Sequence, residues 1–350
     1  MDDGHHHVGC GEVPSDTMKR SVALKRIVDW RLLLFFAPVW LACIANGQSS
    51  DDVHISPAEV MPVKGVPTLN PNGGSFQVNV ELVLVPVSVS DHMNRSVITL
   101  KKEDFTLYEE DKRQEIRYFS AEDAPISVAI LLDVSQSMSN KIDTERAAIV
   151  EFCNNANPDD EYFAIAFSDR PRVLANSAHS VDDVEKKLIA VEPGGPTAML
   201  DAVYLAASRL RSARHKRKAI VIFSDGGDNA SRYTMREVKS MVQESDVQIY
   251  AIGLFETFFF NTIEERLGKK WLSELTDVTG GRTLTVDNRA KLPEAAAVIS
   301  RELRNEYVLG YRPETTSAGR WRKIRVAIAS SVNGEPLHAY YKRGYLAPGQ

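Results

Sequence analysis

Four short apolar segments, separated by stretches with helical periodicity, constrain the fold more than any other feature of the sequence. They are ISVAILLD, YFAIAFSD, KAIVIFSD and VQIYAIG, all within residues 126–253. Such short and nearly continuous apolar runs are typical of strands that are buried on both faces. Parallel strands need crossover helices between them, so the alternation predicts an α/β fold with a doubly wound, mainly parallel sheet covered on both faces.

The helical stretches lie around 142–156, 181–190, 198–211, 234–245, 266–277 and 290–304. One face of the helix that follows Thr197 is apolar at the i, i+3, i+4 spacing of a core-facing stripe. Cys153 falls on the apolar side of the first helix, where we expect a small core residue and not a nucleophile.

Strand-like segments flank this α/β domain, which we place at residues 122–304. Residues 76–121 alternate between apolar and polar and include a hairpin with a charged turn near 111–113. The strand pattern returns at 305–346 in NEYVLGYRP, RWRKIRVAIAS and LHAYYKRGYLA. Because these late strands are too few to fold alone, we expect them to pair with the 76–121 unit in a small β-sandwich-like domain.

The N-terminal extension, residues 1–47, indicates export. Basic residues precede an apolar run at 32–45, whose length fits a signal peptide and is short for a membrane-spanning helix. We expect cleavage near Ala45 to Gly47, with an uncleaved membrane anchor at 32–45 as the alternative. The residues before Met18 add nothing to a signal, which favours Met18 as the true start. The protein is therefore expected to be exported, either periplasmic or extracellular.

Residues 48–75 are rich in Pro, Asn, Gly and Ser and indicate an extended linker. The formal net charge of −5 argues against a nucleic-acid partner, because binding to phosphates requires a basic face. The sequence also lacks a Walker loop, a His-Glu-x-x-His motif, a Gly-x-Ser-x-Gly motif and a paired Cys motif. The common enzyme signatures are thus absent.

Polar side chains follow two of the predicted strands, at the point where each strand ends. Asp133, Ser135 and Ser137 follow the first strand, and Asp225 ends the segment KAIVIFSD. Thr197 lies in the Gly/Pro loop that leads into a helix. Ligands of open α/β sheets bind outside the carboxyl ends of the strands, and hydroxyl and carboxylate oxygens suit Mg²⁺. A cation with so few anionic ligands should attract a further carboxylate from outside.

These elements resemble the metal-ion-dependent adhesion site of von Willebrand factor type A domains. They are the Asp-x-Ser-x-Ser at 133–137, the Gly-Gly-x-Thr loop and the FSDG at 223–226, in the family's order, and the resemblance covers about residues 123–304. It implies a metal site whose ligands are Asp133, Ser135, Ser137, Thr197 and Asp225, the last directly or through water. The implied ion is Mg²⁺, with Mn²⁺ or Ca²⁺ as alternatives.

The flanking segments DFTLYEEDKRQEIRYFS, EYVLGYRP and GRWRKIRV are similar to those of exported bacterial von Willebrand factor A-related proteins, best known from Acidobacteria. This extends the resemblance to most of residues 76–346. It implies a non-enzymatic adhesion or scaffolding module of the cell envelope that binds a protein partner's carboxylate through Mg²⁺. Loops at 169–180, 194–197 and 255–265 are expected to set specificity for the partner.

Two other functions stay open. In the first, a Mg²⁺-dependent phosphatase of the haloacid-dehalogenase type would use Asp133, Thr197, Lys218 and either Asp225 or Asp228. Those enzymes carry a second Asp two residues after the nucleophile, and here that position is Ser135, whose hydroxyl cannot shuttle a proton at neutral pH. In the second, the chain is a purely structural envelope protein.

The candidate ligands also have simpler structural roles. Ser135, Ser137 and Thr197 could cap the helices that follow them, and Asp225 could be a turn acid. The three consecutive phenylalanines at 258–260 could form either an exposed apolar contact or an edge of the core.

Overall fold

A computed structural model of the chain describes residues 61–64, 79–121, 123–155, 157–178, 180–255, 263–314, 319–329, 331–332 and 335–347. The predicted signal, most of the predicted linker and the phenylalanines at 258–260 lie outside these residues. Among the described helices, none combines the length and the apolar character that crossing a membrane would need.

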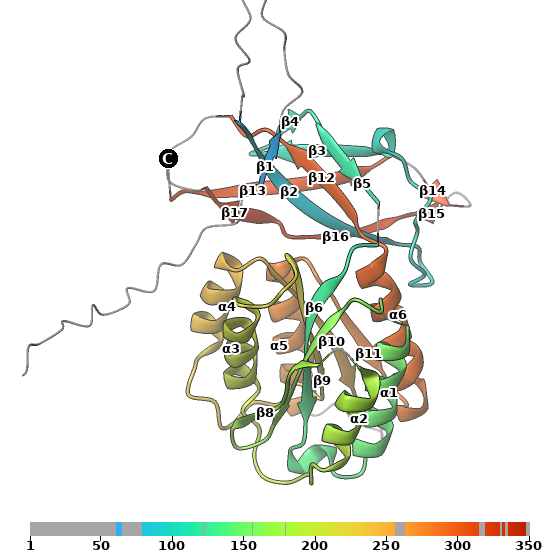
Figure 1. The fold of residues 1–350 in the computed structure, drawn as a ribbon, viewed down its shortest axis with the longest axis vertical. Coiled ribbons are helices and arrows are strands. Elements are labelled where there is room, and N and C mark those ends of the chain that lie inside the picture. Colours follow the sequence, from blue (N-terminus) through green and yellow to red (C-terminus); the bar gives the residue numbers. More distant parts are fainter. Residues whose placement is uncertain are drawn as a thin grey trace, which may run out of the picture. The chain divides into compact units, whose positions relative to one another are not determined.

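A six-stranded sheet forms the centre of the α/β domain, in the order β11-β10-β9-β6-β7-β8 (Figure 1). Its strands are β6 (Ile126–Asp133), β7 (Glu161–Phe167), β8 (Pro171–Ala178), β9 (Arg217–Ser224), β10 (Val247–Leu254) and β11 (Thr283–Val286). All neighbouring pairs are parallel except β7 with β8. The predicted doubly wound, mainly parallel sheet is confirmed.

Two of these strands are not predicted from the sequence. β8 occupies most of the segment 169–180, which was expected to be a loop, and it forms an edge of the sheet. Its residues are intermediate or exposed, so it lacks the continuous apolar run that marks the central strands. β11, at the other edge, has only four residues.

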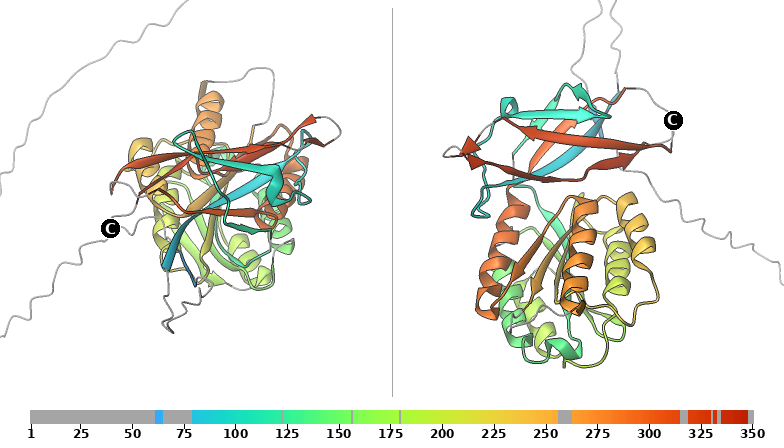
Figure 2. Two further views of the ribbon diagram at one scale, coloured as in Figure 1. Left: turned by 90° about the horizontal axis from the view of Figure 1, so that it is seen from above. Right: turned by 180° about the vertical axis from the view of Figure 1, so that it is seen from behind.

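Three helices cover each face of the sheet (Figure 2). On one face lie α1 (Ile142–Asn154), α2 (Val181–Ile189) and α6 (Leu292–Arg304); on the other lie α3 (Met199–Leu210), α4 (Met235–Glu244) and α5 (Ile263–Thr279). Alternate residues of β6 belong to the two cores, because successive side chains of a strand point to opposite faces. Cys153 is buried in the first core, and burial raises the pKa of its thiol to about 12.

Antiparallel strands make up the rest of the described chain. One sheet contains β1 (Met61–Lys64), β2 (Asn79–Ser90), β5 (Tyr118–Ser120), β12 (Tyr307–Tyr311) and β16 (His338–Tyr341). Another contains β3 (Phe105–Glu109), β4 (Lys112–Gln114), β13 (Trp321–Ile328) and β17 (Gly344–Leu346), and a short pair is formed by β14 (Ser331–Val332) and β15 (Glu335–Pro336). A third apolar core packs between the two larger sheets.

The strands after residue 304 pair with strands that precede the α/β domain. β12 and β16 both pair with β2, and β13 pairs with β3. β1 lies inside the segment interpreted as an extended linker, and it also pairs with β2. An extended segment needs only a free strand edge to join a sheet, so the polar composition of the linker does not prevent this pairing.

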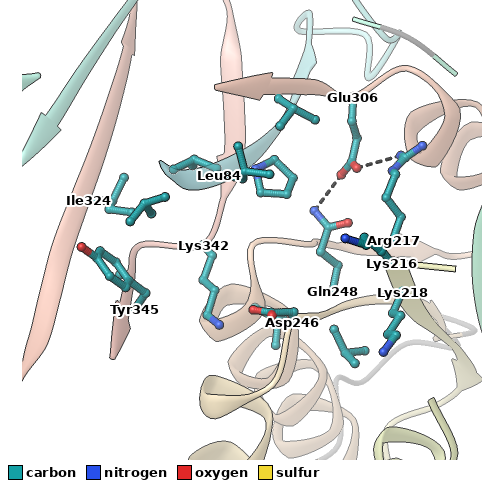
Figure 3. Close-up of a pocket in the computed structure, with 17 residues that line it drawn as sticks. Leu84, Lys216, Arg217, Lys218, Asp246, Gln248, Glu306, Ile324, Lys342 and Tyr345 are labelled. Atoms are coloured by element: carbon teal, nitrogen blue, oxygen red, sulfur yellow. Dashed lines mark hydrogen bonds and ion pairs between the residues drawn. The ribbon is translucent and has the colours of Figure 1, made fainter. Parts of the chain in front are cut away.

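Buried charged groups connect the antiparallel strands to the α/β domain. Glu306, directly before β12, accepts hydrogen bonds from Arg217 Nη2 (2.8 Å) and Gln248 Nε2 (2.6 Å). Figure 3 shows this network beside a pocket of about 220 Å³, whose wall also includes Leu84 and Lys342. The polar groups of this pocket are thus largely bonded within the chain.

A second buried pair lies close to the same boundary. Arg282 Nε donates to Glu302 of α6 (2.7 Å), and Arg282 Nη1 donates to Asn94 Oδ1 (2.7 Å). The side chains of Arg282 and Glu302 are 5% and 2% exposed. Burial opposes the charge of Arg282, but the Glu302 carboxylate outweighs it and raises the pKa of the guanidinium.

We predict that Arg282→Met lowers the free energy of unfolding by about 3–5 kcal/mol, because it leaves the Glu302 carboxyl group buried without its partner. Replacing both residues, as Arg282→Met with Glu302→Leu, should recover most of this loss, since no unpaired charge then remains. Urea unfolding of the three proteins measures the difference. A double variant that is no more stable than the single one would contradict this account of the pair.

Candidate metal-binding site

The predicted site residues lie at the carboxyl edge of the central sheet. The chain passes from β6 to β7 on one side and later returns to β9 on the other side, so the strand order reverses at β6. Asp133 is the last residue of β6, and Asp225 directly follows β9. Crevices at such a reversal are the usual ligand sites of open α/β sheets.

The first loop is organised by the carboxylate of Asp133, which is fully buried. Its Oδ1 accepts the backbone N–H of Ser135 (2.9 Å), and its Oδ2 accepts the hydroxyl of Ser224 at the end of β9. The hydroxyls of Ser135 and Ser137 lie 3.1 Å apart and form a hydrogen bond with each other. The carboxylate therefore joins the ends of two neighbouring strands and fixes the start of the loop.

The serine hydroxyls do not cap the helices that follow. Ser135 precedes the short 3₁₀ turn at Gln136–Met138 but makes no side-chain capping bond, and the residue before α1 is Lys141. The capping role that the sequence left open for these hydroxyls is therefore wrong, and both oxygens can take another ligand.

The second loop is attached to the first through its backbone. Gly195 adopts φ +85°, a conformation that favours glycine, and its carbonyl accepts the N–H of Gln136 (2.9 Å). The N–H of Thr197 donates to Asn229 Oδ1 (2.8 Å), and its carbonyl accepts the N–H of Asn229 (2.9 Å). The residue before α3 is Ala198, so Thr197 does not cap that helix and its hydroxyl is not used there.

The third loop places Asp225 beside Thr197. Asp225 Oδ1 accepts the N–H of Gly227 (3.3 Å), as a turn acid would. A Cβ atom built on Gly227 would lie 3.4 Å from Asp225 Oδ1 and 3.9 Å from Thr197 Oγ1, so both oxygens face the same glycine. Gly226 has φ +80°, and its Cβ position would lie 2.4 Å from the carbonyl oxygen of Gly268. No larger residue fits there.

One pocket brings these loops together. It has a volume of about 710 Å³, and Ser137, Thr197, Asp225 and Lys141 contribute to its lining. Asp133 and Ser135 are buried behind it, connected to it through the hydrogen bonds of the first loop. Its apolar wall is formed by Leu254, Phe255, Leu267 and Trp271. Three of the five predicted residues therefore line one cavity, and the other two are joined to it through the first loop.

Charges in the site are poorly compensated within the chain. Burial and the charge of Asp225 together raise the pKa of Asp133 to about 7. Lys141 Nζ lies 3.8 Å from Asp225 Oδ2. Glu145 of α1 is also fully buried, and burial and the nearby Asp133 raise the pKa of its carboxyl group well above the ordinary value.

The sequence analysis missed several residues that shape the site. Ser224, Asn229, Lys141 and Glu145 were not singled out, although each contacts or electrostatically influences a predicted ligand. The signal for Glu145 is its spacing, three residues after Ile142 and three before Ala148, both of them core residues of α1. An acid at such a position is placed in the apolar core, where acidic residues are rarely found unless they have a partner or a function.

Lys218 was assigned to the alternative phosphatase scheme, and the structure places it elsewhere. It lies near the start of β9, whereas Asp225 follows the end of that strand. Its Nζ donates to the carbonyl of Arg211 (3.3 Å), and it lines the pocket of Figure 3. This lysine therefore cannot act together with Asp133.

The assembled groups fit a hard divalent cation. Hydroxyls of Ser135, Ser137 and Thr197 and the two aspartates supply only oxygen donors, which Mg²⁺, Mn²⁺ and Ca²⁺ prefer. Within the described ranges, no group of three or more His, Cys, Asp and Glu residues is arranged to hold a metal. The donor set at this site consists mainly of hydroxyl oxygens, which such a group does not include.

A doubly wound, mainly parallel sheet with hydroxyl and carboxylate groups gathered at its strand ends defines the class of this α/β domain. Residues 128–227 match the sequence model of the von Willebrand factor type A domain. The resemblance to this family, drawn from the three loop motifs, is therefore confirmed over this part of the chain.

Several solved structures are similar to the chain. A von Willebrand factor type A protein from Catenulispora acidiphila has 13% identity and a TM-score of 0.46, over 78% of this chain and 75% of that one. The von Willebrand factor domain of the pilus tip protein Mfa5 from Porphyromonas gingivalis has 13% identity and a TM-score of 0.42, over 52% and 95%. BatB from Bacteroides thetaiotaomicron has 18% identity and a TM-score of 0.41, over 51% and 98%. No curated protein matches the sequence.

We predict that the metal-free protein loses stability as the pH rises from 5 to 8. The pKa of Asp133 is raised to about 7 in the folded state, so the folded protein keeps a proton that the unfolded chain releases above its ordinary pKa of 3.8. Stability is thus greatest at low pH, falls as the pH rises toward 7 and levels off above 7, with a loss of about 1.4 kcal/mol for each pH unit between the two pKa values.

Urea unfolding in the presence of a chelator, at intervals between pH 5 and 8, measures this effect. Asp133→Asn should remove much of the loss, because the amide does not ionise. A wild-type protein whose stability is constant or rises over this range would show that Asp133 is ionised throughout.

Proposed function

We propose that the chain is a non-enzymatic, Mg²⁺-dependent protein-binding module that acts in adhesion or scaffolding at the bacterial cell envelope. The observation that carries this proposal is a group of three hydroxyls that serve no capping role at the carboxyl edge of the sheet. Ser137 and Thr197 line one cavity, and the hydroxyl of Ser135 is hydrogen-bonded to that of Ser137. Placing such groups together beside Asp225 has no evident structural benefit without a cation.

The hydroxyls of Ser135, Ser137 and Thr197 would bind the ion directly. Asp133 would orient the first loop and hold the ion's water, and Asp225 would act directly or through water. Mg²⁺ keeps several waters in protein sites, so a position remains open for a carboxylate of the partner. Mn²⁺ or Ca²⁺ could replace Mg²⁺ at the same oxygen ligands.

The lining of the pocket supports binding of a protein side chain. Leu267, which lines it, is 45% exposed, and Trp271 and Phe255 lie on the same wall. A partner acid entering the pocket would bring apolar atoms of its own chain against this wall. Aromatic side chains of this kind are enriched in the contact surfaces of proteins.

The phosphatase alternative is weakened by the position of Lys218 and by Ser135 in place of a second aspartate. The alternative of a purely structural envelope protein differs from the proposal only in lacking a metal-dependent partner. We also propose the division into a β unit at 76–121, the ion-binding domain at 122–304 and returning strands at 305–346. Export through the 1–47 segment, to the periplasm or the cell exterior, completes the proposal.

We predict saturable binding of Mg²⁺ and Mn²⁺ by the full chain in isothermal titration. Ser135→Ala and Thr197→Ala should each weaken binding by about tenfold or more, the equivalent of about 1.4 kcal/mol of lost ligand interaction. Asp133→Ala should abolish it. Ser139→Ala is the matched control, because this hydroxyl of the same loop donates only to the carbonyl of Gln136 and is exposed.

A folded wild-type protein that binds no divalent ion, or variants that bind as well as the control, would reject the site. Partner binding is tested by capture of envelope proteins on immobilised wild type in Mg²⁺. Specific capture should be released by chelator and be absent with Thr197→Ala. Phosphate release from p-nitrophenyl phosphate that depends on Asp133 would instead restore the enzyme alternative.

A further inference from the structure

A buried carboxyl group outside the predicted ligand set lies beneath the first loop. Glu145 belongs to the first turn of α1 and is completely buried. Neither of its carboxylate oxygens has a hydrogen-bond partner among the described residues. The N–H of Asp133 faces this carboxyl group and favours its ionised form, without reaching hydrogen-bonding geometry.

Such a position is costly for an acid. A buried polar group without a hydrogen bond lowers stability, and a buried charge without a partner lowers it further. The rest of this face of α1 is apolar, with Ile142, Ala148 and Ile149 in the core. An apolar residue at 145 would complete this face at no electrostatic cost, so the packing of α1 does not explain the glutamate.

The charges around Glu145 point toward the ion site. Asp133 and Asp225 both act on its carboxyl group by repulsion, and Lys141 acts by attraction. The same Lys141 lies beside Asp225. Three carboxylates and one ammonium group leave two negative charges when all are ionised, and one divalent cation supplies the two positive charges required.

We propose that Glu145 is a third carboxylate of the ion site, which attracts the cation from behind the first loop and does not enter its predicted ligand set. The inference rests on the proposed function, since it concerns the same ion. Glu145 acts as a positioning residue that adds negative charge next to Asp133. This charge makes the electrostatic potential at the cavity more negative, so the site favours ions of higher charge.

The test compares ions of different charge on the purified full chain. Mn²⁺ binding is followed by isothermal titration, and Tb³⁺ binding by luminescence sensitised through Trp271, which lines the cavity. An electrostatic contribution scales with the charge of the ion, so Glu145→Gln should weaken Mn²⁺ binding about tenfold and Tb³⁺ binding about thirtyfold. Glu145→Asp keeps the charge and should bind both ions within about threefold of the wild type.

Two further variants separate the possible outcomes. Asp143→Asn removes a carboxylate from the same turn of α1 whose side chain is 91% exposed, and it should leave both affinities unchanged. Asp133→Ala defines the background binding of each ion elsewhere on the chain. Circular dichroism and thermal melting establish that each variant is folded.

Unchanged ion affinities in a folded Glu145→Gln protein would overturn the inference and leave the proposed function intact. Equal losses for Mn²⁺ and Tb³⁺ would also overturn it, because distortion of the loop does not depend on the charge of the ion. A wild type that binds no better than Asp133→Ala would reject the proposed function and this inference together.

Discussion

The carboxylate of Asp133 is the interaction on which the candidate site depends. Its two oxygens bond groups from different strands, the N–H of Ser135 after β6 and the hydroxyl of Ser224 at the end of β9. These strands are neighbours at the point where the strand order reverses. One side chain therefore connects the two strand ends that border the crevice. The price is a buried carboxyl group with a raised pKa, which a cation would relieve.

The remaining loops are positioned by backbone contacts that few residues permit. Gly195 reaches the first loop through its carbonyl because a positive φ turns the chain there. Gly226 allows the third loop to approach Gly268 of α5 closely. These backbone contacts therefore set the positions of the second and third loops, which bring Thr197 and Asp225 to the cavity.

Sequence periodicity predicted the sheet well and its edges poorly. β6, β7, β9 and β10 are buried on both faces, so their apolar runs are continuous and easy to recognise. β8 and β11 are edge strands without such a run and were missed. The loop motifs indicated the candidate ligands, but Asn229 could not be found in this way, because its role arises from a contact with Thr197, which is distant in sequence. Glu145 lies outside the motifs and is marked only by its place among the core residues of α1.

The insertion of the α/β domain between paired β strands also bears on the site. The chain enters the domain at the amino end of β6, six residues after β5 ends at Ser120, and it leaves through α6 into β12. β6 has eight residues, so its carboxyl end lies about 25 Å from that entry, at about 3.3 Å for each residue. Both covalent connections thus lie at the edge opposite the candidate ligands. The antiparallel strands therefore attach at the edge of the central sheet that is opposite the cavity. They do not obstruct the three loops that surround it.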